Sequence, residues 1–403
     1  MSFDANRFYS IRAYLTRDIN EPIVSEKAFE LHPDTIISFN IIESVLTILP
    51  KFEMVLTDKG TIIEQFPILD KDVLTVIIGN DPESEPILTC SFIISGIKAE
   101  SDTQQMQGNY IRLNGYLATQ KSFIINFKRV FSGSSDEVLN NIATEIGLKF
   151  NADAKGAEFN DWYQYGTNYQ FIKHISERAF VPNDGVYVYG DTKGQLNYTT
   201  IQTKISKGVR FTAKYSMDRV ENKIKIEEEN TIYFDAFDII NISEIYNNIA
   251  NYGGTYIYYD LTDNIELDVR NPHKTTDMYN RKEMYTAENA YYFIMGSIND
   301  SSISQTMFHG MLANNTSRYS IFSNTIAITI NSSTPINLFD VIDIKIPSTI
   351  ERGKGMAEPY SGEYVVLSIS NALTKNTPYS KTIMLGRSGI NKPTVEFEHK
   401  GVS

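Results

Sequence analysis

Three stretches in the middle of the chain decide the fold: SSDEVLNNIATEIGLKF (residues 134–150), DWYQYGTNYQFIKHISERA (161–179) and DGVYVYGDTKGQLNYTTI (184–201). The first opens with the spacing of a helix-capping box, and the second contains this spacing at Thr167 and Gln170. Apolar residues at the helical period follow each box. The third alternates as strands do around a tight turn. This order predicts a compact module of two helices and a hairpin.

The first helix is expected to begin after Ser134 and to end at Gly147. Ser134 and Glu137 can each bond a backbone amide of the first turn. Glycine easily adopts the left-handed conformation that ends many helices. The apolar residues between them form one face: Val138, Leu139, Ile142 and Ile146.

The second helix is expected after Thr167, which forms another capping box with Gln170. Its apolar stripe should pack on the first helix and consists of Phe171, Ile172, Ile175 and Ala179. Beyond it, Val186–Tyr189 and Gln195–Ile201 predict the two strands of the hairpin, joined by a turn at Asp191–Gly194.

The composition points to several β-rich domains. A chain of 403 residues and 45.8 kDa exceeds one ordinary core, and two to four domains are expected. With 25 Tyr and 22 Phe beside 13 Pro, aromatic residues suited to a pleated surface are abundant. The expected class is predominantly β with some helix.

The net charge of −12 argues against a protein that wraps nucleic acid, because phosphate contacts need clustered Lys and Arg. An acidic wall suits a conduit through which DNA slides without sticking. The same balance also keeps ordinary proteins soluble, which is the commoner explanation.

The single cysteine, Cys90, lies in the apolar run Ile87–Ile94 and is interpreted as a buried thiol. No secretion signal precedes the chain's first strands, and no segment approaches the roughly 18 apolar residues of a membrane span. We therefore expect synthesis in the cytoplasm and no membrane insertion.

Two β-rich blocks flank the module, at about residues 10–130 and 320–390. In the first, turns separate strands expected at Thr35–Ile42, Glu53–Thr57, Thr61–Phe66, Val73–Ile78, Ile87–Ile94, Tyr110–Ala118 and Phe123–Val130. This block predicts a closed or nearly closed antiparallel barrel. In the second, strands are expected at Thr325–Ile330, Val341–Ile346, Tyr364–Ile369 and Lys381–Leu385.

The region between the module and the second block gives mixed signals. Its expected elements are a strand in Val209–Ile226, a charged loop at Glu227–Asn230, a short strand and helix in Tyr233–Ala250, strands in Asn251–Asn264 around a Gly253-Gly254 turn, and a long surface loop at Asn271–Ala290.

The order of the three opening stretches resembles the inserted module of baseplate central hub proteins of contractile-tailed bacteriophages. That family includes the late control protein D family and the spike hubs of type VI secretion. NYGGTYIYYDLTDN (251–264) is similar to a segment of the same proteins. Three later strings resemble the hub's second barrel: INLFDVIDIKIP (336–347), SGEYVVLSISNAL (361–373) and TPYSKTIMLGR (377–387). Asn371 stands where the family often has a histidine.

The resemblance implies an α+β, predominantly β fold with two tail-tube-like antiparallel β-barrel domains and an inserted helix-helix-hairpin module. The implied domains are a first barrel at 1–130 that is completed by about 205–230, the module at 131–204, a mixed α/β middle region with a long surface loop at 231–320, and a second barrel at 321–403.

The function implied by the resemblance is structural, not enzymatic. It is a trimeric baseplate hub that joins the six-fold tail tube to the three-fold central spike and forms part of the channel for DNA ejection. The implied partners are two further copies of the chain, the central spike protein, the tail tube or tube-initiator protein, and surrounding baseplate wedge proteins. Genomic DNA would pass without specific binding. The implied location is the tail baseplate of the virion, assembled in the host cytoplasm.

No catalytic, cofactor-binding or metal-binding residue is predicted. The five histidines include no pair at the helical spacing that lets two imidazoles share a metal: His32, His174, His273, His309 and His399. His174 is interpreted as solvated. Asp235 and Asp238 could form a glycosidase pair only by chance, and Gly353-Lys354-Gly355 lacks the context of a phosphate-binding loop.

The aromatic cluster of the module leaves an alternative open. Its members could form a sugar-stacking platform or, as we favour, the module's core and edge: Trp162, Tyr163, Tyr165 and Tyr169. The alternative function is a tail-associated protein that binds or cleaves glycan or peptidoglycan.

Overall fold

The structure is a computed structural model, and its described part covers most of the two β-rich blocks and the module. The described residues are 9–24, 26–58, 62–80, 85–101, 109–182, 184–215, 230–234, 236–240, 255–260, 266–270, 291–296, 310–311, 313–314, 317–318, 321, 324–330, 334–346, 360–375 and 377–387. Histidines 273, 309 and 399, Asp235, and the segments 227–229, 241–254, 271–290 and 353–355 lie outside this part.

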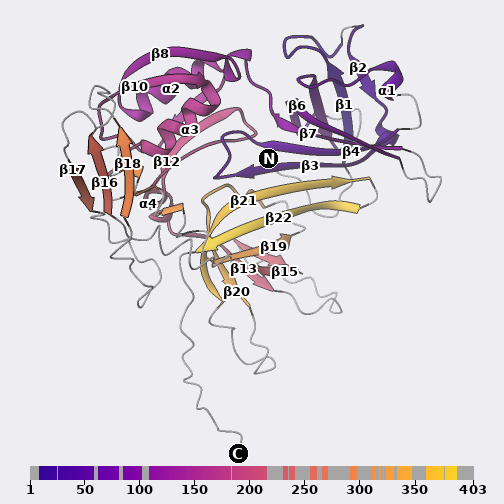
Figure 1. The fold of residues 1–403 in the computed structure, drawn as a ribbon. Coiled ribbons are helices and arrows are strands. Elements are labelled where there is room, and N and C mark those ends of the chain that lie inside the picture. Colours follow the sequence, from indigo (N-terminus) through magenta and orange to yellow (C-terminus); the bar gives the residue numbers. More distant parts are fainter. Residues whose placement is uncertain are drawn as a thin grey trace, which may run out of the picture.

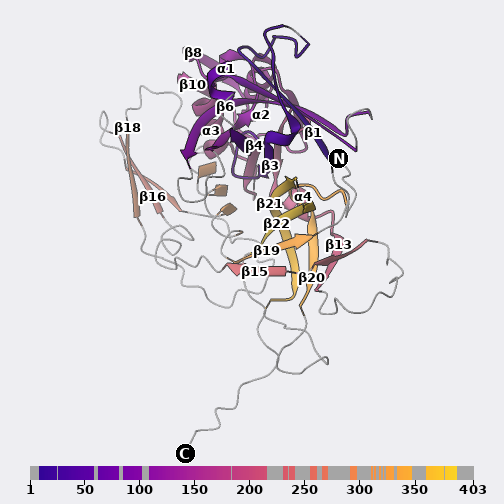
Figure 2. The same cartoon turned by 90° about the vertical axis from the view of Figure 1, so that its right-hand side faces the viewer.

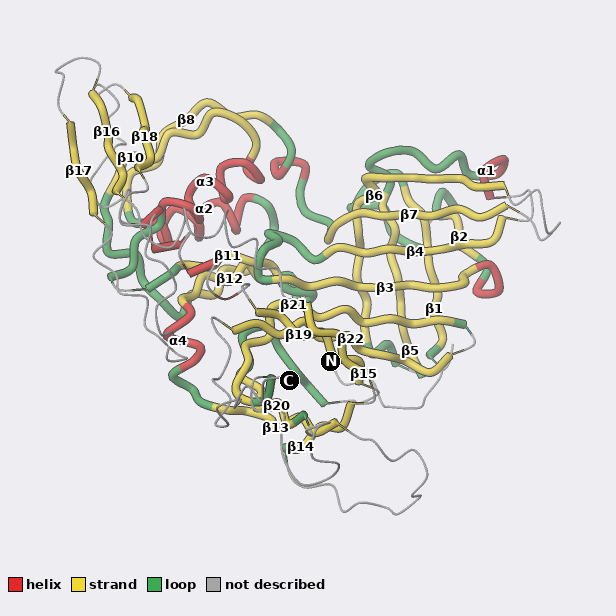
Figure 3. The backbone as a smooth tube through the Cα atoms, turned by 60° about the horizontal axis from the view of Figure 1, so that its bottom comes forward, coloured by secondary structure: helices red, strands yellow, loops and turns green. Residues whose placement is uncertain are grey.

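The fold is predominantly β, as the sequence predicts. One 14-stranded sheet runs through both β-rich blocks and curls strongly (Figures 1 and 3). Seven strands make its first half, all antiparallel, in the order β2 (Phe29–Leu31), β1 (Ser10–Thr16), β5 (Val73–Gly79), β6 (Leu88–Ser101), β7 (Asn109–Leu117), β4 (Lys51–Asp58) and β3 (Ile36–Ser44).

The first half is a curled half-barrel that does not close on itself. β2 is its outer edge, and the second hydrogen-bonded neighbour of β3 is β21 (Gly362–Thr374) of the second half. The β3–β21 seam is antiparallel and runs from Ser44 opposite Ser368 to Ser38 opposite Thr374. The expected pair of separate barrels is therefore joined into one sheet by backbone hydrogen bonds.

The second half is assembled from two separate parts of the chain. Its remaining strands are β13 (Val209–Tyr215), β14 (Thr231–Phe234), β15 (Ala236–Ile240), β19 (Asn324–Ile330), β20 (Val341–Lys345) and β22 (Thr377–Arg387). β13 pairs in parallel with both β14 and β20, whereas the other pairs are antiparallel. The expectation of purely antiparallel pairing fails here.

The strand β13 also corrects the expected completion of the first barrel by residues 205–230. It pairs with β20 and not with any strand of the first half. The reason is burial: Phe211 and Ala213 face the core of the second half together with Ile342 and Ile344. Local β-propensity predicts this strand but carries no information on its partner.

The module forms as predicted. α2 (Ser135–Glu145) starts after Ser134, whose backbone N–H is bonded by the Glu137 carboxylate at 3.2 Å, and Gly147 is left-handed with φ 81°. α3 (Asn168–Arg178) starts at the Thr167–Gln170 capping box and contacts α2. The hairpin consists of β11 (Val186–Gly190) and β12 (Gln195–Thr200).

Several module elements were not predicted. Trp162, Tyr163 and Tyr165 of the aromatic cluster lie on β10 (Asn160–Thr167), and Tyr169 lies on α3. β10 pairs with β8 (Asn126–Gly133) as a two-stranded ribbon beside the helices (Figure 1). A strand was expected at Phe123–Val130, but its assignment to the first barrel is wrong, because β8 pairs with β10 in a separate sheet. β9 (Lys149–Ala152) adds to the hairpin in parallel with β12. A short α4 (Ile201–Ile205) then leads into β13.

One predicted strand is wrong. The segment Thr61–Phe66 contains the single-turn helix α1 (Ile62–Gln65). Asp58 accepts the Ile62 N–H at 3.1 Å, and the Phe66 N–H bonds the Ile62 carbonyl at 2.9 Å. The Ile62 and Phe66 side chains are both buried, at the four-residue spacing of a helical turn. A pattern of alternating residues could not predict this arrangement.

We use the name excursion for the described residues between β15 and β19, which lie outside the large sheet. It contains a three-stranded sheet of β16 (Thr255–Asp260), β17 (Glu266–Arg270) and β18 (Tyr291–Gly296), set apart from the large sheet (Figure 2). The described residues from 310 to 321 are helical and reach the module. There Asn314 accepts the Val186 N–H at 2.7 Å and donates to the carbonyls of Ser176, Glu177 and Ala179 at the end of α3.

Two hydrophobic cores result, and β11 lies between them. Val186 and Val188 belong to the core shared by the first half and the module helices. Tyr187 and Tyr189 belong to the core of the second half. Because successive side chains of a strand point to opposite faces, this one strand joins both cores.

Candidate functional site

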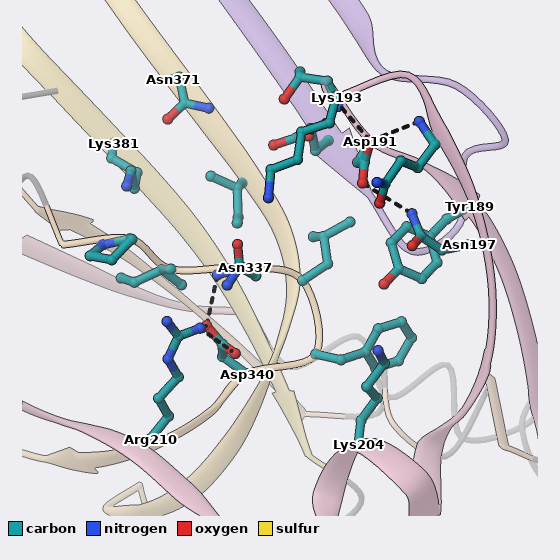
Figure 4. Close-up of a pocket in the computed structure, with 18 of the residues that line it drawn as sticks. Tyr189, Asp191, Lys193, Asn197, Lys204, Arg210, Asn337, Asp340, Asn371 and Lys381 are labelled. Carbon is teal, nitrogen blue, oxygen red and sulfur yellow. Dashed lines mark hydrogen bonds and ion pairs between the residues drawn. The ribbon is translucent and has the colours of Figure 1, made fainter. Parts of the chain in front are cut away.

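A polar groove of about 910 Å³ lies where the first half, the module and the second half meet (Figure 4). Its walls come from β3, the β11–β12 turn, α4, the start of β13, the loop 335–340, β21 and β22.

The β11–β12 turn forms one wall and is fixed to the first half. Asp191 shapes the turn by accepting the N–H groups of Lys193 at 2.9 Å and Gln195 at 3.0 Å. The Thr192 N–H donates to the Glu43 carboxylate on β3 at 2.8 Å. Burial of the Glu43 side chain raises its pKa, so the contact with the turn is made by a desolvated acid.

A buried cysteine contacts the same turn. The Cys90 thiol on β6 lies 3.6 Å from the Thr192 carbonyl. Burial raises the pKa of this thiol to about 12, which keeps it protonated and unreactive. Its expected role as a buried thiol is confirmed.

The loop before β20 forms the opposite wall and joins the second half to the module. The Arg210 guanidinium bonds both oxygens of Asp340, at 3.0 and 2.7 Å, and the Asn337 N–H donates to the same carboxylate at 2.7 Å. Phe339 is left-handed with φ 67° and packs its ring against Tyr187 and Tyr189, at centroid distances of 5.0 and 5.5 Å.

The third wall is formed by β21 and β22. Asn371 accepts the Tyr379 hydroxyl at 2.6 Å. Lys381 is only 6% exposed and donates to the Thr334 carbonyl at 3.0 Å. Burial lowers the pKa of this lysine to about 8.

The comparison with solved structures identifies the fold. A tail protein from Neisseria meningitidis MC58 superimposes with a TM-score of 0.55 at 11% identity, over 95% of this chain and 98% of that one. The 43 kDa tail protein of prophage MuSo2 from Shewanella oneidensis gives 0.54 at 12% identity, over 94% and 98%. The fold is that of tail proteins. No family model and no curated protein matches the chain.

Within this tail-protein fold, the aromatic cluster of the module is split between core and surface. Trp162 is fully buried and its indole N–H donates to the Gly133 carbonyl at 3.0 Å. Tyr165 and Tyr169 are 76% and 47% exposed. The favoured interpretation as core and edge is confirmed, and Trp162 is not available to stack on a sugar.

The remaining candidates are scattered over the tail-protein fold. His32 caps a short turn by accepting the Asp34 N–H at 3.2 Å, and His174 stacks on Phe171 in the module. Asp238 lies on β15. Among the described residues, no group of His, Cys, Asp or Glu is arranged to hold a metal ion. No described helix is long and apolar enough to cross a membrane.

The groove residues were not singled out from the sequence. Glu43, Arg210, Asp340 and Lys381 come from four segments of the chain. Asp340 and Lys381 lie in two of the strings that resemble the hub's second barrel, but no pattern there assigns them a role in a site. The turn at Asp191–Gly194 is a further sequence signal near the groove, because its residue types fix its shape. Asn371, which marks the departure from the hub pattern, lies in the groove wall.

Proposed function

We propose that this chain is a structural component of a phage-type tail, and specifically the trimeric hub of a contractile-tail baseplate. It joins the six-fold tail tube to the three-fold central spike and lines part of the channel for DNA ejection. The observation that carries the proposal is the match in fold over nearly the whole length of two tail proteins.

The arrangement of the sheet supports the proposed symmetry. Each chain contributes two curled half-barrels joined at the β3–β21 seam. Three chains would therefore supply six similar half-barrels around one axis, which is what a junction between six-fold and three-fold components requires. The domain division at 1–130, 131–204, 231–320 and 321–403 is part of this proposal, with β8 assigned to the module and β13 to the second barrel.

The proposed partners are two further copies of the chain, the central spike protein, the tail tube or tube-initiator protein, and baseplate wedge proteins. An acidic chain with a net charge of −12 suits a channel through which DNA passes without specific binding. The proposed location is the virion tail baseplate, assembled in the host cytoplasm, and the proposed role is not enzymatic.

Mass measurement of the purified chain by light scattering tests the proposal. The hub predicts a particle of three 45.8 kDa chains, and electron microscopy of that particle should show a ring with six similar lobes. A monomer under all conditions, or a ring of another order, would contradict it.

The alternative, a glycan-binding or glycan-cleaving tail protein, is tested on the same sample with purified peptidoglycan. Sedimentation with peptidoglycan should leave the hub in solution. Retention that is lost in Tyr165→Ala, with the exposed Lys121→Gln as a control, would favour the alternative.

A further inference from the structure

The groove is a locally basic region in an acidic chain. Three carboxylates lie in its walls: Glu43, Asp191 and Asp340. Five cationic side chains line the same walls: Lys193, Lys204, Lys207, Arg210 and Lys381. In a chain of net charge −12, this excess of cations around one concavity concentrates positive potential there.

The carboxylates of the groove are already occupied by donors of the chain. Glu43 bonds the Thr192 N–H, and Asp191 bonds three donors of its own hairpin. Asp340 receives two bonds from Arg210 and one from Asn337. Asp191 and Asp340 are consequently poor partners for an incoming cation. For Glu43, burial raises the pKa and disfavours the charged form that would bind a cation.

Two of the cations, in contrast, have donors to spare. Among the described residues, Lys193 has no hydrogen-bond acceptor for its ammonium group, and it points into the groove from the hairpin turn (Figure 4). Lys381 has three ammonium hydrogens and only the Thr334 carbonyl as a described acceptor. Lys381 is buried, and a buried ammonium group with unused donors is costly unless an acceptor binds it. Lys193 is exposed in its turn, so its ammonium group is accessible to a ligand.

The other three cations hold the shape of the site. Lys204 pairs with Asp153 at 2.6 Å, with Lys207 at 3.9 Å from the same carboxylate, and Arg210 pairs with Asp340. Asp153 and Asp340 offset much of the charge of these three side chains, while Lys193 and Lys381 keep donors that no described acceptor fills. The groove volume of about 910 Å³ greatly exceeds that of a single oxyanion and lies in the range of pockets that hold drug-sized ligands, so a ligand with several oxyanion groups has room to bind.

We propose that this groove binds an extended ligand that carries oxyanion groups, carboxylate or phosphate, held by the ammonium groups of Lys193 and Lys381. The oxyanion can be presented by an acidic peptide segment of a protein partner or by a free polyanion. The proposal is independent of the trimeric hub, because all the residues come from one chain.

Binding of hexaglutamate, measured by calorimetry with the full chain, tests the peptide source, and hexaglutamine is the neutral control. Tripolyphosphate tests the free polyanion. Lys193→Gln and Lys381→Met should each weaken binding by roughly tenfold, because each removes one charged hydrogen-bond donor. Lys121→Gln, which removes an exposed lysine that pairs with Asp18 on the first half, should leave affinity unchanged.

The outcomes separate the sources. Binding of hexaglutamate that depends on both groove lysines supports a peptide ligand, and binding of tripolyphosphate alone supports a free phosphate. Binding of neither at physiological salt overturns the proposal, as does binding that Lys121→Gln weakens as much as Lys193→Gln. Circular dichroism of Lys381→Met checks its fold, and Lys193, which is exposed in a turn, provides the variant that leaves the core intact.

Discussion

The two halves of the large sheet curl alike but obtain their strands differently. The first half takes its seven strands from residues 10–117 without interruption, and every pair is antiparallel. The second half combines residues 209–240 with residues 324–387 and contains two parallel pairs around β13. A parallel pair needs a long crossover, so its partner is distant in the chain. The comparison shows that similar curvature can be built from local or from non-local pairing.

The halves also depend on each other. β3 and β21 form a continuous ladder, and β11 contributes valines to one core and tyrosines to the other. We therefore expect them to unfold together even though their connectivities differ.

The largest expected effect comes from truncating one buried aromatic in each half. Phe52 packs on Phe92 at 4.9 Å in the first half, and Phe234 packs on Tyr215 at 5.5 Å in the second. Phe52→Ala and Phe234→Ala should each lower the free energy of unfolding by about 3–5 kcal/mol. Urea unfolding, followed by tryptophan fluorescence and circular dichroism, should show one shared transition. Two transitions, of which each variant moves only one, would mean that the halves are independent.

The next effect concerns the excursion that only the second half has. Asn314→Leu removes the acceptor of the Val186 N–H and the donor to three carbonyls at the end of α3. Stability should fall by about 2–4 kcal/mol, because buried polar groups lose their partners. Hydrogen exchange at Val186 should accelerate more than at the centre of β5. Asn140→Leu, at an exposed position of α2, is the control and should have almost no effect.

A third prediction contrasts buried charges. In the first half, buried Asp72 is paired with Arg17. In the second half, buried Lys381 has the Thr334 carbonyl as its one hydrogen-bond acceptor among the described residues. Since burial lowers the Lys381 pKa from 10.5 to about 8, the folded state loses this proton before the unfolded state does. This lysine therefore destabilises the fold below pH 8, and the penalty is relieved between about pH 8 and 10.5.

Lys381→Met should be the more stable protein at pH 7, and its advantage should shrink by at most about 3 kcal/mol over that pH window. Cys90 and the buried tyrosines have raised pKa values, so their ionisation lowers the stability of the folded protein in alkali. Both proteins contain these groups, so the difference in stability between variant and wild type reports on Lys381 alone. An advantage that stays constant from pH 7 to 10.5 would show that the lysine is not desolvated. Lys121→Gln is the exposed control.

The smallest effects are expected at two tightly packed glycines, one in each half. A Cβ at Gly115 on β7 would lie 2.0 Å from the Ile93 carbonyl oxygen, and a Cβ at Gly386 on β22 would lie 2.4 Å from the Ile321 carbonyl oxygen. Each change to alanine should cost about 1–3 kcal/mol through overpacking. Thermal unfolding measures both. A Gly386→Ala variant as stable as the wild type would indicate that the residues around Ile321 shift at little cost.

Sequence patterns predicted the parts whose information is local. α2 and α3 were each predicted from a capping box and an apolar stripe. These signals are local, because they lie within a few helical turns. β10 was missed because Trp162 and its neighbours look like a cluster of aromatics, and their burial depends on α3 and β8. α1 was mistaken for a strand because four residues are too few to distinguish the two periods.

The sequence by itself determined that this protein is predominantly β, that a helix-helix-hairpin module interrupts it, and where the module's helices begin. Only the tertiary structure decided that the two halves share one sheet, that β13 joins the second, and that Glu43, Arg210, Asp340 and Lys381 surround one groove. The physical reason is the range of the interactions: capping and periodicity act between near neighbours, while strand pairing and groove formation join residues hundreds of positions apart.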